Sequence, residues 1–126
     1  MVRKAVVTGN APKPAFSYSQ GIVAHGLLFV SGQVPVDPAT KAVPEAFADQ
    51  VRRAMDNVAA VAEAAGARLS DAVRVGVYLA DLADFEEMDR VYREYFEEPL
   101  PARTTLGTAL LGFAVEVDAV IALEAG

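Results

Sequence analysis

The chain has 126 residues, no cysteine and a formal net charge of −6, and 53% of its residues are hydrophobic. This length predicts a single domain spanning residues 1–126, with a core that needs no covalent staples. The scattered lysines and arginines lack the basic patch that nucleic-acid binding requires, and the missing cysteines exclude disulfides, thiolate nucleophiles and cysteine-ligated metals.

The chain also lacks the apolar runs that mark membrane spans and secretory signals. No run approaches the ~20 apolar residues that cross a bilayer. Met1-Val2-Arg3-Lys4 is not followed by the apolar block of a signal peptide. We therefore expect no membrane association and a cytoplasmic location.

The N-terminal third predicts three strands. They cover Lys4–Thr8, Gly21–Ala24 and Leu27–Ser31, and the last two form a hairpin around the turn His25-Gly26. A loop rich in proline follows from Gln33 to Pro44. The only histidine lies in the predicted turn, so we assign it no catalytic role.

The next segment predicts a long helix followed by a strand. Hydrophobic residues recur at helical spacing, and Gly66 then ends the helix. The repeating residues are Phe47, Val51, Ala54, Val58, Val61 and Ala65. Val73–Leu79 predicts the strand.

A second helix and two strands complete the chain. Asp81 or Asp84 caps the helix, and an apolar stripe marks its buried face. The stripe comprises Phe85, Met88, Tyr92 and Tyr95, and Pro99 and Pro101 end the helix. The final strands are predicted at Arg103–Thr108 and Ala114–Leu123.

This β-β-β-α-β-α-β-β order predicts an α+β sandwich, with both helices covering one face of a mixed sheet. Leu27-Leu28-Phe29-Val30 and Val120-Ile121-Ala122-Leu123 are apolar on both sides of their strands. Such strands are buried on both faces. Because only two helices are available, we predict that a second subunit covers the other face.

Three charged residues near the C-terminus are candidates for chemistry. The Arg103 guanidinium presents a rigid donor fork that fits a carboxylate, although an ordinary salt bridge is the alternative. Glu116 and Asp118 project from the same strand face and could orient or deprotonate a water, or form a solvent-facing polar stripe, which we favour for Asp118. No metal-ligand cluster of recognisable spacing is present.

Six motifs, in order along the chain, resemble the reactive-intermediate deaminase family (Rid, or YjgF-type). They are Tyr18-Ser19-Gln20-Gly21, Phe29-Val30-Ser31-Gly32-Gln33-Val34-Pro35, Asp56-Asn57-Val58, Val77-Tyr78-Leu79, Pro101-Ala102-Arg103-Thr104-Thr105 and Val115-Glu116-Val117. The resemblance implies a chorismate-mutase-like fold, homotrimers with clefts between subunits, and hydrolysis of 2-imino acids to a keto acid and ammonia. It implies no metal and no organic cofactor.

The resemblance also implies roles for four residues. Arg103 would bind the substrate carboxylate, and Glu116 would act as the general base for the attacking water. Tyr18 would offer its ring and hydroxyl at the cleft wall, or simply pack against a strand edge. Ser31 would donate a hydrogen bond.

Four residues depart from the family pattern around this cleft. They are Phe16, Asp89, Gly107 and Phe113. These changes leave the activation of water possible, and an altered pocket with Phe16 and Phe113 at its rim could prefer a ligand other than the usual small imino acid. Two alternatives to the deaminase therefore stand: a non-catalytic trimeric binder of small carboxylates, and a divergent, pathway-specific hydrolase.

Overall fold

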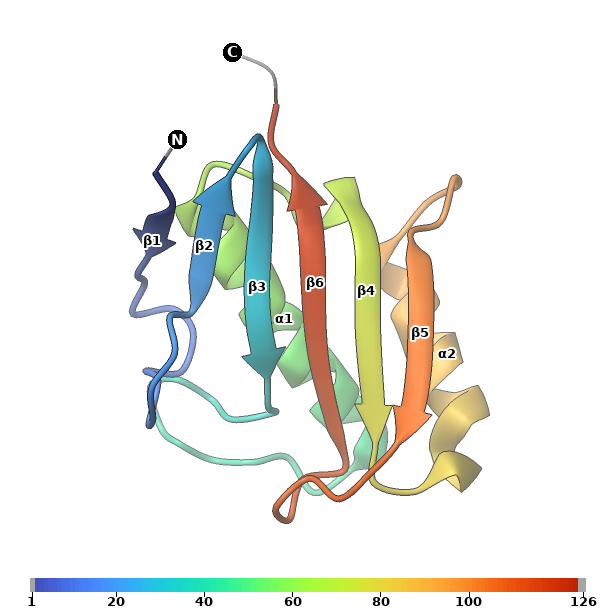
Figure 1. Cartoon of the computed structure of the whole chain (residues 1–126). Helices are drawn as coiled ribbons and strands as arrows, with labels where there is room; N and C mark the ends of the chain where they lie inside the picture. The colour runs from blue at the N-terminus through green and yellow to red at the C-terminus, as the bar shows by residue number, and fades with distance from the viewer. Residues whose placement is uncertain (1, 125–126) are drawn as a thin grey trace.

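Short apolar segments separated by turn residues form the six strands of one sheet (Figure 1). The computed structural model describes residues 2–124. The strands are β1 (Lys4–Val6), β2 (Gly21–Ala24), β3 (Leu27–Gln33), β4 (Ala72–Leu79), β5 (Ala102–Gly107) and β6 (Val115–Ala122). Their order across the sheet is β1-β2-β3-β6-β4-β5, and only β4 and β5 pair in parallel.

Two α-helices lie against one face of the sheet and leave the other face open (Figure 1). They are α1 (Phe47–Ala64) and α2 (Phe85–Tyr92). Three single 3₁₀ turns, η1 (Leu69–Asp71), η2 (Leu82–Asp84) and η3 (Arg93–Tyr95), flank β4 and α2. The predicted α+β architecture and its element order are confirmed.

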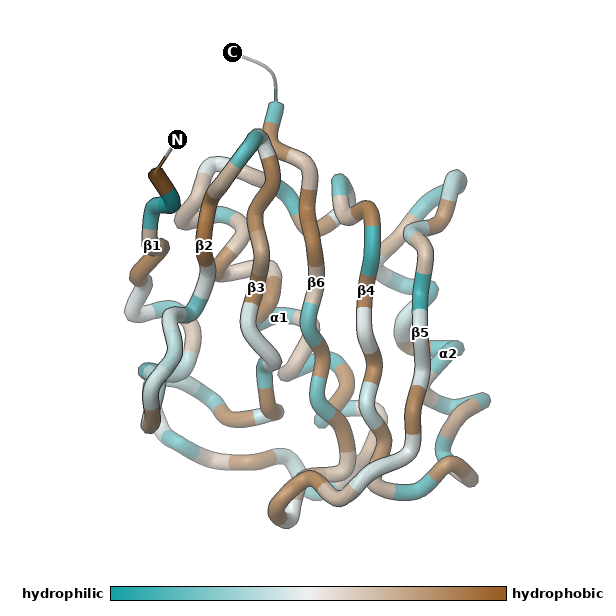
Figure 2. Tube along the Cα trace, in the orientation of Figure 1, coloured by the Kyte–Doolittle hydropathy of each residue, from teal (hydrophilic) through white to brown (hydrophobic). Residues whose placement is uncertain are grey.

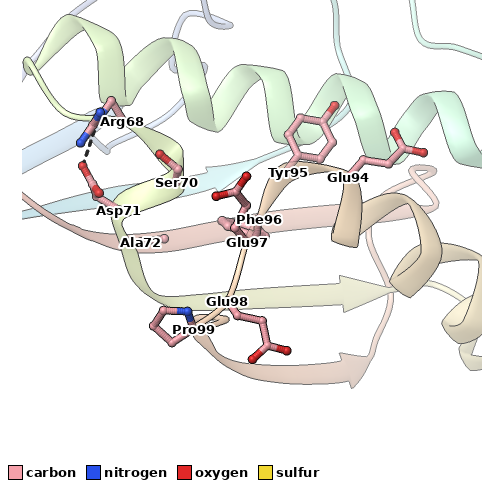
Figure 3. Close-up of a pocket in the computed structure, with 10 residues that line it drawn as sticks. All are labelled: Arg68, Ser70, Asp71, Ala72, Glu94, Tyr95, Phe96, Glu97, Glu98 and Pro99. Atoms are coloured by element: carbon pink, nitrogen blue, oxygen red, sulfur yellow. Dashed lines mark hydrogen bonds and ion pairs between the residues drawn. The ribbon is translucent and has the colours of Figure 1, made fainter.

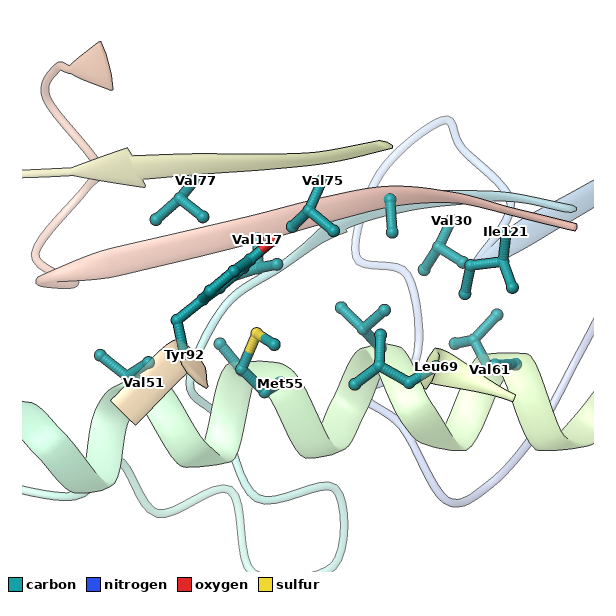
Figure 4. Close-up of a cluster of buried hydrophobic side chains, with 14 of the residues drawn as sticks. Val30, Val51, Met55, Val61, Leu69, Val75, Val77, Tyr92, Val117 and Ile121 are labelled. Carbon is teal, nitrogen blue, oxygen red and sulfur yellow. The ribbon is translucent and has the colours of Figure 1, made fainter. Parts of the chain in front are cut away.

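The hydrophobic core fills the space between α1 and the sheet. Side chains alternate along a strand, so every second residue of β6 points toward the helices. These residues, Val115, Val117, Ala119 and Ile121, are all buried. Figure 4 shows Val117 and Ile121 directed toward α1, where Met55 and Val61 meet them.

The structure differs from the predicted boundaries by more than one residue at three places, and the bounds of β4, β5 and β6 shift by a single residue. β3 continues past Ser31 to Gln33, whose side chain is buried. α2 ends at Tyr92, and Tyr95 belongs to the 3₁₀ turn that follows. β1 stops at Val6 because the buried Gln20 amide hydrogen-bonds the backbone of Thr8, in place of a neighbouring strand.

The predicted hairpin turn is confirmed. His25 and Gly26 have φ angles of 52° and 75°. Positive φ at both central residues is the geometry of a tight two-residue hairpin loop, and it matches the twist of the flanking strands. The single histidine therefore has a backbone role in the fold.

The open face of the sheet carries a broad apolar area. Phe29 on β3 is 44% exposed, and its neighbours on this face, Leu27, Val120 and Ala122, are only partly buried. Figure 2 shows hydrophobic residues gathered along β2, β3 and the C-terminal half of β6. An exposed apolar patch of this kind is typical of an interaction surface.

Asn57 fixes the loop that follows β3. Its side chain is completely buried on α1, and its amide nitrogen donates to the carbonyls of Val34 and Val36, both at 3.0 Å. The amide oxygen accepts from Arg53 at 2.9 Å. One side chain thus satisfies two buried carbonyls and ties the loop to the core.

We expect Asn57→Ala to destabilise the chain by about 2 kcal/mol, because both carbonyls lose their donor inside the protein. Urea unfolding measures this free energy directly. Asn10→Ala, at an exposed position, is the matched control and should change stability by less than about 0.5 kcal/mol. Equal stability of the two variants would contradict the anchoring role of Asn57.

Candidate functional site

Three of the four predicted site residues line one groove. Tyr18, Ser31 and Glu116 meet in a hollow of about 650 Å³, which Phe16 and Phe113 also line. Tyr18 and Phe16 come from the loop before β2, Ser31 from β3 and Glu116 from β6. Phe16 and Phe113, two of the residues that depart from the family pattern, thus lie beside the predicted site residues.

Glu116 points to the open face because its neighbours Val115 and Val117 point into the core. Its carboxylate lies across Gly32, in the space that a Cβ at this position would occupy. A side chain at position 32 would displace the acid from its present place. Burial, together with the nearby charge of Asp118, raises the pKa of Glu116 above its usual value of 4.5. This carboxylate is therefore easier to protonate than a solvent-exposed one.

Asp118 belongs to a polar cluster beside the groove, although the sequence favoured a solvent-facing position. The Tyr78 hydroxyl donates to Asp118 Oδ2 at 2.8 Å, and Arg74 Nη1 lies 3.9 Å from Oδ1. Gly76 lies opposite Asp118 in the strand register and leaves room for its carboxylate. A glycine inside a strand is a signal of close approach, and it could have indicated this cluster.

Ser31 and Tyr18 have different surroundings in the groove. The Ser31 hydroxyl donates to the Ser19 carbonyl at 2.5 Å, which commits its proton to the protein. This hydrogen bond supports the loop that carries Tyr18, and the donation of the Ser31 hydroxyl to a ligand stays a prediction. Tyr18 is exposed, so its ring and hydroxyl are free to contact a bound molecule.

Arg103 is separated from this groove by the sheet itself. It lies on the edge strand β5, opposite the buried Val75 of β4, and its guanidinium stacks over the rings of Tyr92 and Phe85. Arg103 Nη1 donates to Asp89 Oδ1 at 2.7 Å. The sequence placed Arg103 and Glu116 in one site. Within one chain they project from opposite faces of the sheet.

A second hollow of about 680 Å³ lies between the start of β4 and the segment after η3 (Figure 3). Arg68 and Asp71 pair across 3.1 Å at its rim, and Glu94 pairs with Arg52. Glu97 and Glu98 also line this hollow, so its lining is predominantly acidic, and none of the predicted site residues lines it.

The part of the chain that the structure describes, residues 2–124, contains neither a metal-binding cluster nor a membrane-spanning helix. Within this range no three potential metal-ligating side chains gather closely enough to hold an ion. Neither of the described α-helices has both the length and the apolar character to cross a bilayer.

Comparisons with known proteins agree with the fold and with the motifs. The family model described as "Endoribonuclease L-PSP" matches residues 8–123. A RutC family protein of Pyrococcus horikoshii is 41% identical, over 94% of this chain and 97% of its own length. The 2-iminobutanoate/2-iminopropanoate deaminase of Escherichia coli is 37% identical, over 91% and 92% of the two chains.

A solved structure extends this agreement to three dimensions. RidA from an Antarctic Psychrobacter is 33% identical, with a TM-score of 0.90 over 95% of this chain and 99% of its own. The matches span nearly the whole chain, and the six motifs lie within residues 8–123, which the family model covers. The chain therefore belongs to the YjgF/RutC/Rid family.

Proposed function

We propose that the protein hydrolyses 2-imino acids to 2-keto acids and ammonia without a cofactor. The observation that carries this proposal is the Glu116 carboxylate, held over Gly32 in an open groove with a raised pKa. A base in such a place can take a proton from water near neutral pH. The relative named 2-iminobutanoate/2-iminopropanoate deaminase supports this reaction, whereas the net charge of −6 gives RNA binding no electrostatic support.

In the proposed reaction, Glu116 accepts a proton from a water molecule as the water oxygen attacks the imine carbon. The C=N double bond becomes a single bond, which gives a carbinolamine. Protonation of the nitrogen and collapse of the carbinolamine break the C–N bond, release ammonia and leave the keto group. Glu116 exchanges protons in both halves, and Arg103 holds the substrate carboxylate.

We further propose that the complete site forms between subunits of a homotrimer. Arg103 lies at the sheet edge on the helix side, while Glu116 lies on the open face, so a second chain must bring the two together. The exposed apolar area around Phe29 supports such an assembly, because subunit contact would remove it from water. The family resemblance supplies the number three.

Replacing Glu116 tests the general base. We expect Glu116→Gln to lower kcat by about 10²- to 10³-fold, with binding of 2-oxobutanoate retained, because the amide keeps the shape of the acid but accepts no proton. Enzymatically generated 2-iminobutanoate is the substrate, and semicarbazide traps the imine that escapes hydrolysis. Glu86→Gln, an exposed acid of α2, is the control.

The outcomes separate the candidate functions. Unchanged kcat in Glu116→Gln contradicts the assignment of the base. Tight binding of 2-oxobutanoate by a wild-type protein that does not accelerate hydrolysis favours the non-catalytic binder. In that case Arg103→Lys should weaken binding, because lysine keeps the charge and loses the donor fork.

The pH profile tests the electrostatic environment of Glu116. Because only the ionised carboxylate accepts a proton, kcat/KM should fall as the pH drops through the raised pKa of Glu116. Asp118→Asn removes the negative charge that raises this pKa, so the acid limb should move toward 4.5. Tyr78→Phe leaves Asp118 charged, so it should not lower the pH at which kcat/KM falls on the acid side of the profile. An identical acid limb of the kcat/KM profile in wild type and Asp118→Asn would refute the effect of the Asp118 charge on the pKa of Glu116.

Substitution of Phe29 tests the assembly. Phe29→Glu places a charge on the open face, so we expect the mass in solution to fall from three times 13.3 kDa to 13.3 kDa. Light scattering coupled to gel filtration measures this mass. Val43→Glu, in the loop before α1, is the control and should leave the assembly intact. A monomeric wild type with full activity would contradict the shared site.

A further inference from the structure

The Arg103 guanidinium is already paired with an acid of its own chain. Nη1 lies 2.7 Å from Asp89 Oδ1, and the two side chains are 19% and 41% exposed. The guanidinium is centred 4.7 Å above the Tyr92 ring and 5.5 Å from the Phe85 ring. Stacking and the ion pair hold it in one orientation, in contact with solvent. An incoming ligand therefore meets a fixed Arg103–Asp89 pair, with no net charge, in place of a lone cation.

Two buried hydroxyls near this pair have no hydrogen-bond partner among residues 2–124. The Tyr92 residue is 3% exposed, and its hydroxyl oxygen is unpartnered. The Thr105 hydroxyl is also buried and unpartnered, and Thr105 shares the helix-facing side of β5 with Arg103. Buried hydroxyls normally find a partner within the protein or in a bound molecule. Both oxygens are enclosed by the protein, so an incoming ligand meets the Arg103–Asp89 pair and not these hydroxyls.

We propose that Asp89 is a specificity-determining residue that makes the Arg103 site select zwitterions, molecules with a carboxylate next to a cationic nitrogen. Arg103 has five donors, and Asp89 uses those of one nitrogen, so the guanidinium can still bind a carboxylate. Asp89 has a second oxygen and a partly exposed side chain, which can accept from a cationic nitrogen. A ligand that has a carboxylate but no cationic nitrogen is attracted by Arg103 and repelled by Asp89.

This inference rests on the proposed function, and it gives Asp89 a role in turnover. The substrate in its iminium form, R–C(=NH₂⁺)–CO₂⁻, is a zwitterion and matches both members of the pair. Addition of water and loss of ammonium leave R–CO–CO₂⁻, which carries a single negative charge and no cation. The charges balance, and the nitrogen leaves with the positive charge. Asp89 therefore favours the substrate over the keto-acid product and promotes release of the product.

Two ligands with the same carbon skeleton test the selection without turnover. 2-Aminobutanoate is a zwitterion, and 2-oxobutanoate is a monoanion. We expect calorimetry to show that the wild type binds 2-aminobutanoate more tightly. In Asp89→Asn, 2-oxobutanoate should bind about tenfold more tightly and 2-aminobutanoate more weakly, because one negative charge beside the guanidinium is removed. A general loss of structure cannot tighten one ligand while it weakens the other.

Two controls accompany this variant. Asp89→Glu keeps the charge and should retain the preference, and Glu86→Gln removes a charge elsewhere on α2 and should not change it. An unchanged ratio of the two affinities in Asp89→Asn overturns the inference. A wild type that prefers 2-oxobutanoate, or binds neither ligand, also overturns it. Selection of 2-aminobutanoate without hydrolysis of any imine would sustain the role of Asp89 while the proposed deaminase activity fails.

Discussion

Both helices lie against the same face of a six-stranded sheet, and the alternation of side chains along each strand then assigns every strand residue to one of two environments. On β6, the valines at 115 and 117 enter the core, so Glu116 between them must face outward. On β5, Arg103 lies in register with the buried Val75 and faces the helices. A shift of one residue in either strand would exchange these environments. The separation of Arg103 from Glu116, and with it the proposed need for a second subunit, follows from this single constraint.

Two glycines make room for carboxylates on the open face of the sheet. Gly32 and Gly76 have no Cβ, and the carboxylates of Glu116 and Asp118 occupy the space that a Cβ would fill. For Glu116, the loss of water on the side that faces the sheet disfavours the charged form and raises the pKa of its carboxyl. Buried amides hold the surrounding loops: Gln20 bonds the backbone of Ala11 and Pro12, and Asn57 bonds that of Val34 and Val36. The groove walls are therefore fixed by side-chain hydrogen bonds to backbone, in addition to apolar packing.

The sequence was sufficient to predict the architecture because its signals are local. Helical spacing marks α1, the pair His25-Gly26 marks a hairpin, and prolines follow α2. It misjudged the end of β3, since Ser31, Gly32 and Gln33 are typical of a turn, yet Gln33 is buried in the sheet. It also extended α2 to Tyr95, because an apolar stripe does not distinguish an α-helix from a final 3₁₀ turn.

The site residues were predicted less completely, for a physical reason. Motif resemblance identified Tyr18, Ser31 and Glu116, and these line one groove. Neither the commitment of the Ser31 hydroxyl to the Ser19 carbonyl nor the pairing of Arg103 with Asp89 has a local signal. The second pair joins a strand to a helix, so its existence depends on how α2 packs against β5. Resemblance to the family's motifs identifies which residues belong to the site, whereas the hydrogen-bond partners of those residues depend on how the elements pack.

The two halves of the proposed cleft differ in charge, and their sum determines the electrostatic potential that a bound substrate would experience. In one half, Arg103 and Asp89 form an ion pair with no net charge. The other half holds two acids, Glu116 and Asp118, and Arg74, 3.9 Å from Asp118, offsets only part of their negative charge. Joining them gives a net negative cleft in a chain whose own charge is −6. In such a field the nitrogen of a bound imine favours its protonated form, and that form is the better electrophile for water. The acidity of the chain, which gives nucleic-acid binding no electrostatic support, therefore favours the chemistry proposed for this cleft.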